Sequence, residues 1–97
     1  MENKEESGAT FSDFLFWLAT MAAVQLRDIP DPGTGKLIDE PNVVGAGHLI
    51  EVVAMLQEKT AGNLSPDEAK LIDSLLYDLR MRFVEIQGGQ KRIIIEP

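Results

Sequence analysis

The sequence predicts an all-α fold, a small three-helix domain in which a helical hairpin packs with a very apolar N-terminal helix. Three segments repeat apolar residues at helical spacing, and two of them begin at recognisable helix caps. The β-branched run at residues 91–97 is too short to form a stable strand alone. With 97 residues the chain suits one domain. We expect a flexible N-terminal tail at 1–9, a helical domain at 10–87 and a C-terminal tail at 88–97.

The first helix is predicted from Thr10 to about Arg27. Thr10 is its expected cap, and Asp13 stands three residues later, close to the capping-box pattern. At about 100° per residue its polar side chains fall in one narrow stripe: Ser12, Asp13, Thr20 and Arg27. Most of the remaining circumference is apolar, and Phe16 lies inside the polar stripe. Such a helix must be covered on more than one side, and two further helices could cover about half of it.

Residues 28–40, DIPDPGTGKLIDE, are expected to form a loop across one end of the helical bundle. Pro30 and Pro32 cannot donate backbone hydrogen bonds, and we expect Ile29, Leu37 and Ile38 to hold the loop against the bundle. PDPGTGKL resembles a phosphate-binding loop only superficially. Pro30 stands where that pattern needs glycine, and Leu37 stands where it needs Ser or Thr. The segment therefore predicts no nucleotide site.

The second helix is predicted from near residue 41 to about residue 60, with proline in its first turn and Asp39 or Glu40 as its cap. Gly45 and Gly47 each cost about 1 kcal/mol relative to alanine inside a helix. Their presence indicates either a weak first turn or the close approach of another helix.

The third helix has the clearest start signal. Ser65 is a typical cap, Pro66 suits the first position and Glu68 completes a capping box. Gly62, just before it, is expected to end the second helix and to form a tight corner between the two. Gly88-Gly89 is expected to end the third helix.

Two groups of residues lie outside the predicted core faces. One is the side of the first helix that two neighbours cannot cover, and the other is a stripe at i, i+4 and i+7 on the third helix. Scattered surface apolar residues need no explanation, but the collinearity of the stripe favours a contact surface. The candidate interface consists of Phe16, Trp17, Thr20, Tyr77, Met81 and Val84. We therefore expect a homodimer or higher homo-oligomer, or binding to a protein partner.

The composition excludes several classes of partner. A net charge of −7 disfavours binding to nucleic acid and to anionic lipid, because both bind clustered Lys and Arg. The absence of cysteine excludes disulfides and thiolate metal sites, and it suits a reducing compartment. The acidic N-terminus lacks signal-peptide features, and the uncharged run at residues 14–26 is shorter than the ~20 residues of a spanning helix. We expect a cytoplasmic protein without an integral membrane segment.

One pair of residues could carry chemistry. His48 is the only histidine, and Glu51 lies about one turn later on the same predicted helix. Two ligands are too few for a metal site, although a symmetric dimer would supply two more. A histidine at the edge of a polar face is the favoured interpretation. No hydroxyl has a positioned base and no carboxylate pair is singled out, so we predict no catalytic residue, metal or cofactor.

Several stretches together resemble the bacterial family catalogued as domain of unknown function 1844. The most specific are EKTAGNL and LYDLRMRF, and the resemblance covers residues 11–86. The matching stretches are Phe11–Ala19, Ile29–Pro32, Glu58–Leu64, Glu68 and Leu75–Phe83. The resemblance implies a small helical cytoplasmic protein and transfers no catalytic residue. The chain departs from the family pattern at Gly45, Gly47 and His48, which weakens any role for His48.

The sequence favours a non-enzymatic self-associating or protein-interaction module. One alternative is a peripheral membrane protein, whose contact residues would be Phe14, Phe16, Trp17 and Met21. Such a helix usually carries Lys and Arg on its polar face, whereas this one ends in a single arginine. The other alternative is a metal-dependent or hydrolytic enzyme that uses His48 and Glu51.

Overall fold

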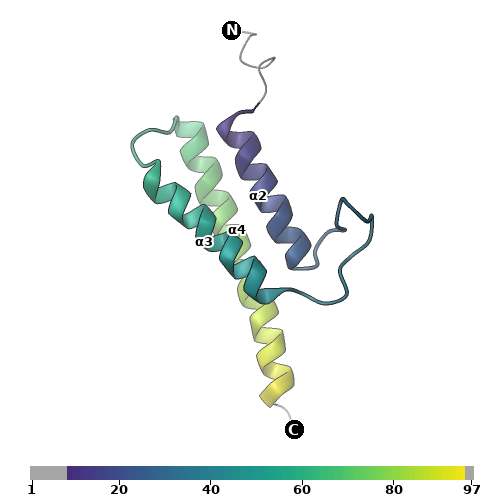
Figure 1. The fold of residues 1–97 in the computed structure, drawn as a ribbon. Helices are drawn as coiled ribbons and strands as arrows, with labels where there is room; N and C mark the ends of the chain where they lie inside the picture. Colours follow the sequence, from purple (N-terminus) through teal and green to yellow (C-terminus); the bar gives the residue numbers. More distant parts are fainter. Residues whose placement is uncertain (1–8, 96–97) are drawn as a thin grey trace.

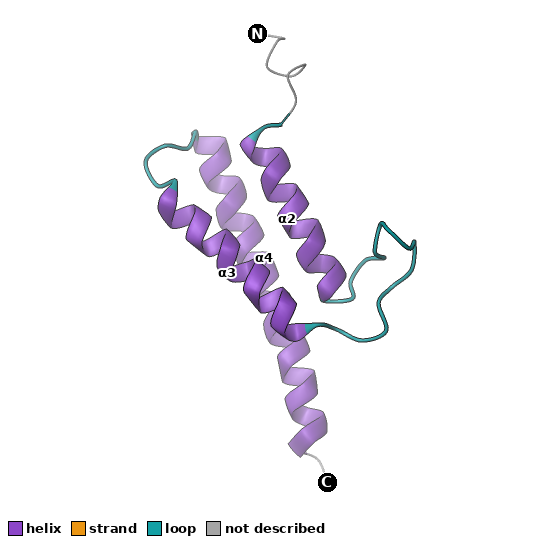
Figure 2. Ribbon diagram, in the orientation of Figure 1, coloured by secondary structure: helices purple, strands orange, loops and turns teal. Residues whose placement is uncertain are grey.

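The structure, a computed structural model, describes the backbone of residues 9–95 and the side chains of residues 9–88. It contains three helices, α2 at Phe11–Gln25, α3 at Val43–Lys59 and α4 at Pro66–Ile95 (Figures 1 and 2). Residues 9–95 form no strand beyond one isolated bridge, Asp31–Lys36. The all-α, three-helix prediction is confirmed. Most of the predicted N-terminal tail, residues 1–8, and residues 96–97 lie outside the described residues.

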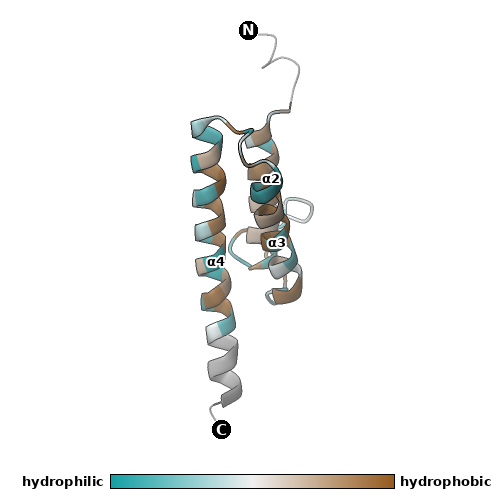
Figure 3. Cartoon of the chain, turned by 90° about the vertical axis from the view of Figure 1, so that its left-hand side faces the viewer, coloured by the Kyte–Doolittle hydropathy of each residue, from teal (hydrophilic) through white to brown (hydrophobic). Residues whose placement is uncertain are grey.

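All three helices pack against one another around one core. α3 and α4 form the expected antiparallel hairpin, and α2 lies against both (Figure 1). The brown, apolar side of α4 is turned toward α2 and α3 in Figure 3. The buried cluster consists of Leu15, Leu18, Ala22, Ile50, Val53, Ile72, Leu76 and Leu79. Burying each Leu, Ile or Val of this cluster contributes about 1.5–3 kcal/mol, so the cluster determines which side of α2 faces inward.

α2 begins as predicted and ends two residues early. The Thr10 hydroxyl accepts the Asp13 N–H at 3.0 Å, and the Asp13 carboxylate accepts the Thr10 N–H at 3.4 Å, which completes the capping box. At the other end Arg27 has a φ of 66°, in the left-handed region. The Arg27 N–H then bonds Val24 O, and the Asp28 N–H bonds Ala23 O. This pair of bonds is the Schellman ending of a helix, which usually uses glycine where Arg27 stands.

The cap of α3 is Asn42, so the prediction of Asp39 or Glu40 is wrong. The Asn42 carboxamide oxygen accepts the Gly45 N–H at 2.9 Å. A Cβ at position 45 would lie 2.7 Å from Asn42 Nδ2, so glycine leaves room for the cap. A Cβ at Gly47 would lie 3.3 Å from the Phe83 ring of α4. The two glycines therefore reflect a crowded first turn and a close helix approach respectively.

The capping box of α4 is confirmed, with Ser65 N–H to Glu68 Oε1 at 2.9 Å and Glu68 N–H to Ser65 Oγ at 3.2 Å. Gly62 in the preceding corner has a φ of 86°, a conformation that favours glycine.

The predicted helix break at Gly88-Gly89 is wrong, because α4 continues to Ile95. Two glycines cost about 2 kcal/mol relative to alanine, and the good helix formers Gln90, Lys91 and Arg92 follow them. The yellow end of α4 in Figure 1 extends beyond α2 and α3. The assignment of residues 88–97 to a tail separate from the domain stays a prediction.

The α4 cap gives a direct stability prediction. Ser65→Ala should lower the free energy of unfolding by about 1 kcal/mol, because the Glu68 N–H loses its acceptor, Ser65 Oγ. Urea unfolding at one fixed protein concentration measures the change. Ser74→Ala is the matched control: Ser74 is exposed within α4, so its replacement should leave stability equal or slightly higher. Equal losses in the two variants would contradict the capping role.

Candidate interaction surface

The surface of α2 outside its core contacts is rich in exposed apolar side chains, with Phe16 on the flank beside α4. Its exposed fractions are 52% for Phe16 and 58% for Trp17, whereas Leu15 on the inner side is 0% exposed. We define the outer face of α2 as Phe14, Phe16, Trp17, Thr20 and Met21. The rings of Phe14 and Trp17 stack with centroids 6.3 Å apart, which makes them one continuous aromatic surface.

Two hydrogen bonds hold the connector between α2 and α3, one to the last residue of α2 and one to Arg27 just beyond it. The Asn42 N–H donates to Gln25 O at 2.7 Å, and Arg27 Nε donates to Ile38 O at 2.7 Å. Ile38 is half-buried, as expected, but Leu37 is 41% exposed, so the expectation that Leu37 holds the loop is wrong. The hydrogen bonds to Gln25 O and Ile38 O hold the loop instead.

Within the connector, the segment from Asp31 to Lys36 forms a tight turn. The Asp31 N–H donates to Lys36 O at 2.9 Å, and the Gly35 N–H donates to Asp31 O at 2.7 Å. The Asp31 carboxylate accepts the Gly33 N–H at 2.8 Å, and Gly35 supplies a φ of 75°. The PDPGTGK sequence is thus used for turn formation.

A salt bridge joins the start of the connector to α4. Arg82 pairs with Asp28, and Arg82 Nε also donates to Asp78 Oδ2 at 3.1 Å. The hydrogen bond with Asp28 is the main cause that raises the pKa of Arg82, with partial burial acting against it and the charges of Asp28 and Asp78 adding to it. Arg82 therefore stays charged and links the end of α2 to α4.

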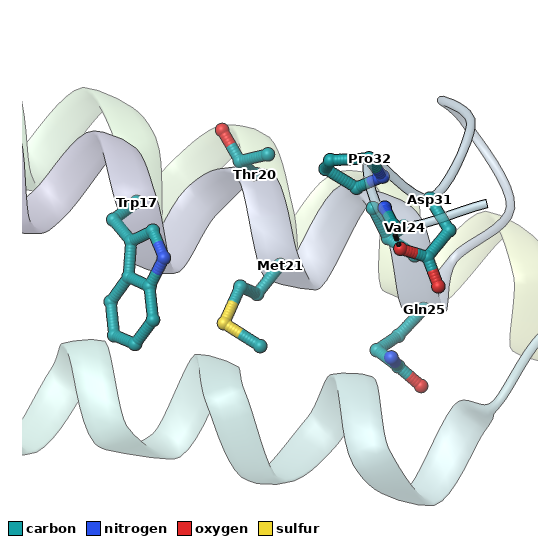
Figure 4. A pocket seen from close by; sticks show the side chains of 8 residues that line it. Trp17, Thr20, Met21, Val24, Gln25, Asp31 and Pro32 are labelled. Carbon is teal, nitrogen blue, oxygen red and sulfur yellow. Dashed lines mark hydrogen bonds between the residues drawn. The ribbon is translucent and has the colours of Figure 1, made fainter. Parts of the chain in front are cut away.

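The connector and α2 enclose a hollow of about 300 Å³ (Figure 4). Figure 4 shows Trp17 and Met21 projecting from α2 on one side, with Pro32 and Asp31 of the connector at the far end. Val24, which lines the hollow, is only 6% exposed, although it does not belong to the buried core cluster. The lining residues are Trp17, Thr20, Met21, Val24, Gln25, Asp31, Pro32 and Gly33. The hollow is mainly apolar and open to solvent, which suits an apolar side chain of a partner.

The six candidate interface residues fall into two separate groups. Trp17 and Thr20 share the hollow, and Phe16 and Thr20 also line a shallow groove with Arg82 of α4. Tyr77 instead lines a groove with Gln57 of α3. We define the α4 stripe as Tyr77, Met81 and Val84, whose exposed fractions are 69%, 47% and 61%.

The sequence did not identify one wall of the hollow. Asp31, Pro32 and Gly33 were expected only as loop residues, yet they stand beside Val24. The turn chemistry of Asp31-Pro32-Gly33 predicts a tight turn. Its position over α2 depends on the ties to Gln25 and Ile38, which join distant parts of the chain.

His48 and Glu51 both lie exposed on α3. Within the described part of the chain, no group of three His, Cys, Asp or Glu side chains is placed to hold a metal ion. The pair therefore has no third protein ligand in its own chain among these residues. Across residues 9–95, no helix combines the length and the apolar character that a bilayer-spanning segment needs.

The chain is thus a small three-helix protein whose first helix, α2, exposes apolar side chains to solvent. The family described as Domain of unknown function (DUF1844) matches residues 8–85, which include α2, α3 and most of α4. The chain belongs to this family, as the resemblance of its EKTAGNL and LYDLRMRF stretches indicated. Comparison with curated proteins and with solved structures gave no significant match.

The position of the connector gives a second prediction. Asp28→Ala removes the bond to Arg82 and should speed amide hydrogen exchange at Asp31 and Gly35, whose N–H groups close the turn. Stability should fall by less than about 1 kcal/mol, because the pair is partly exposed to solvent. Hydrogen exchange followed residue by residue measures both effects.

Asp78→Ala is the matched control for Asp28→Ala. It removes the other carboxylate from Arg82 but leaves the tie to the connector. Exchange at Asp31 and Gly35 should stay unchanged in this variant. Equal acceleration in both variants would show that the Arg82–Asp28 pair does not hold the connector.

Proposed function

We propose that this chain is a non-enzymatic interaction module that self-associates through the outer face of α2. The observation that carries the proposal is the exposure of Phe16 and Trp17, together with the stacked Phe14 ring, beside an apolar hollow. Clustered exposed apolar side chains such as Phe14, Trp17 and Met21 are typical of a protein-interaction site, whereas single exposed apolar residues are not.

The energetics favour covering this face. Complete burial of one large apolar side chain contributes about 1.5–3 kcal/mol, and Trp17 is the residue type most enriched at the centres of interfaces. None of the five outer-face side chains is charged, and charged residues are depleted in interface cores, but the exposed Asp13 lies on the same polar stripe as Thr20. A homodimer is the simplest assembly, because one patch that contacts its own copy closes on itself.

The α4 stripe is the weaker of the two surfaces. Asp73 and Arg80 line the groove beside Tyr77, so its surroundings are charged. Charged residues are depleted at interface cores. We therefore assign the main contact to the outer face of α2 and treat the α4 stripe as a surface to be tested in the same experiment.

Trp17→Gln should weaken self-association by at least about tenfold, because truncation of a central interface tryptophan typically costs 2 kcal/mol or more. Sedimentation velocity over a range of concentrations measures the dissociation constant. Val44→Gln is the matched control, since Val44 is 84% exposed on α3 and lies outside both surfaces. Tyr77→Gln reports on the α4 stripe.

A wild-type chain that stays monomeric at millimolar concentration would refute self-association. An unchanged dissociation constant for Trp17→Gln would show that a different surface is used. A loss confined to Tyr77→Gln would move the interface to the α4 stripe.

Peripheral membrane binding is the competing use of the same aromatic residues. An interfacial helix gains affinity from Lys and Arg beside its apolar side, but the segment from Phe11 to Arg27 contains one cation and the chain has a net charge of −7. We expect the chain to remain in the unbound fraction when floated with vesicles that contain anionic lipid. Co-flotation that Trp17→Gln abolishes would favour the membrane function instead.

A further inference from the structure

The residue that follows the last turn of α2 has an unusual backbone. Arg27 has a φ of 66°, in the left-handed region that glycine usually occupies in a Schellman ending. Within the described backbone it is the only residue other than glycine with a positive φ. A residue with a Cβ is disfavoured in this region and stays there only where its surroundings hold it. Backbone strain is therefore concentrated at the junction between α2 and the connector.

Three contacts hold this junction in place. The strained residue itself supplies one, because Arg27 Nε donates to Ile38 O at 2.7 Å. The Asn42 N–H donates to the last residue of α2 at 2.7 Å, and Asp28 pairs with Arg82 of α4. The two side-chain contacts are exposed to solvent, where such contacts contribute little net stability. The connector is thus held by few and weak bonds.

Between these contacts the connector lies outside the helical core. The bonds between Asp31 and Lys36 close its turn without help from the helices. None of residues 28–42 belongs to the core cluster or to the partly buried apolar residues packed against it. Figure 1 shows the connector looping away from the bundle between the end of α2 and the start of α3. Displacing the connector would therefore leave the core cluster intact.

The connector also decides whether the hollow has a far wall. Pro32 and Gly33 line the hollow together with Val24 of α2 (Figure 4). Val24 is 6% exposed without belonging to the core cluster. Movement of the connector away from α2 would remove this wall and expose Val24.

We propose that the connector is a hinged strap, with its hinge at Arg27, that opens and closes the hollow while the three-helix core stays folded. The structure has the strap closed, with the Arg27 side chain bonded to the connector and the Arg27 backbone strained. Opening lets Arg27 leave the left-handed region, so the strain favours opening while the three contacts oppose it. This inference concerns the wall of the hollow and does not depend on the proposed self-association.

The absence of cysteine from the sequence allows a direct test of opening. Val24→Cys places a single thiol beside the strap, and Val53→Cys, at a position 1% exposed in the core cluster, is the matched control. The rate of labelling by the thiol reagent DTNB is measured for each folded variant and divided by its rate in urea. This ratio should be at least about tenfold higher at position 24, because local opening requires less free energy than global unfolding.

A second substitution in each cysteine variant separates strap opening from unfolding. Ser65→Ala weakens the cap of α4, far from the strap, so it should speed labelling at position 53 and leave position 24 unchanged. Arg27→Ala removes the bond to Ile38 O and should speed labelling at position 24. Arg27→Gly removes the same bond but relieves the strain, so labelling should be at least about fivefold slower than with alanine.

Three results would overturn the strap. Equal labelling ratios at positions 24 and 53 would show that Val24 is uncovered only when the whole chain unfolds. Labelling at position 24 that Arg27→Ala does not change would show that the Arg27 side chain does not hold the connector. Equal rates for the alanine and glycine variants of Arg27 would show that the hinge lies elsewhere.

Discussion

Burial of the inner side of α2 against α3 and α4 is the interaction on which the rest of the structure depends. Leu15 and Ala22 are completely buried there, and Ile72 of α4 meets them in the same cluster. Two neighbours on one side leave the other side uncovered, and α2 is apolar on both. The sequence that builds the core therefore also places Phe16 and Trp17 on the surface.

The connector modifies this surface without covering it. Its ties to Gln25 and Arg82 hold its turn next to Val24, so the apolar side of α2 is closed at one end and open at the other. Exposed aromatic rings and a walled hollow therefore lie along the same helix.

The sequence predicted the parts of the fold that local chemistry decides. Thr10 with Asp13 and Ser65 with Glu68 each form a capping box within four residues, so both helix starts were predictable. The start of α3 was not predictable in the same way. Asp39, Glu40 and Asn42 lie within two residues of Pro41 and all have side chains that can cap a helix, and in the structure Asn42 is the cap.

The failed predictions share a dependence on context. Gly88-Gly89 lies within a long helix, where two glycines lower stability without ending the element. For the candidate surface, the periodicity of α2 identified Phe16, Trp17 and Thr20 as outward residues. The hollow beside them was not predictable, because Asp28 and Arg82, which help to position its wall, are 54 residues apart in the sequence.

Trp17 is the only tryptophan, so its fluorescence reports on the outer face of α2 alone. The most direct measurement is acrylamide quenching of this fluorescence as the concentration of the unmodified chain is raised. Self-association through α2 predicts that quenching decreases with concentration and levels off as the dimer fills. Quenching that stays constant from dilute monomer to the highest soluble concentration would contradict the account.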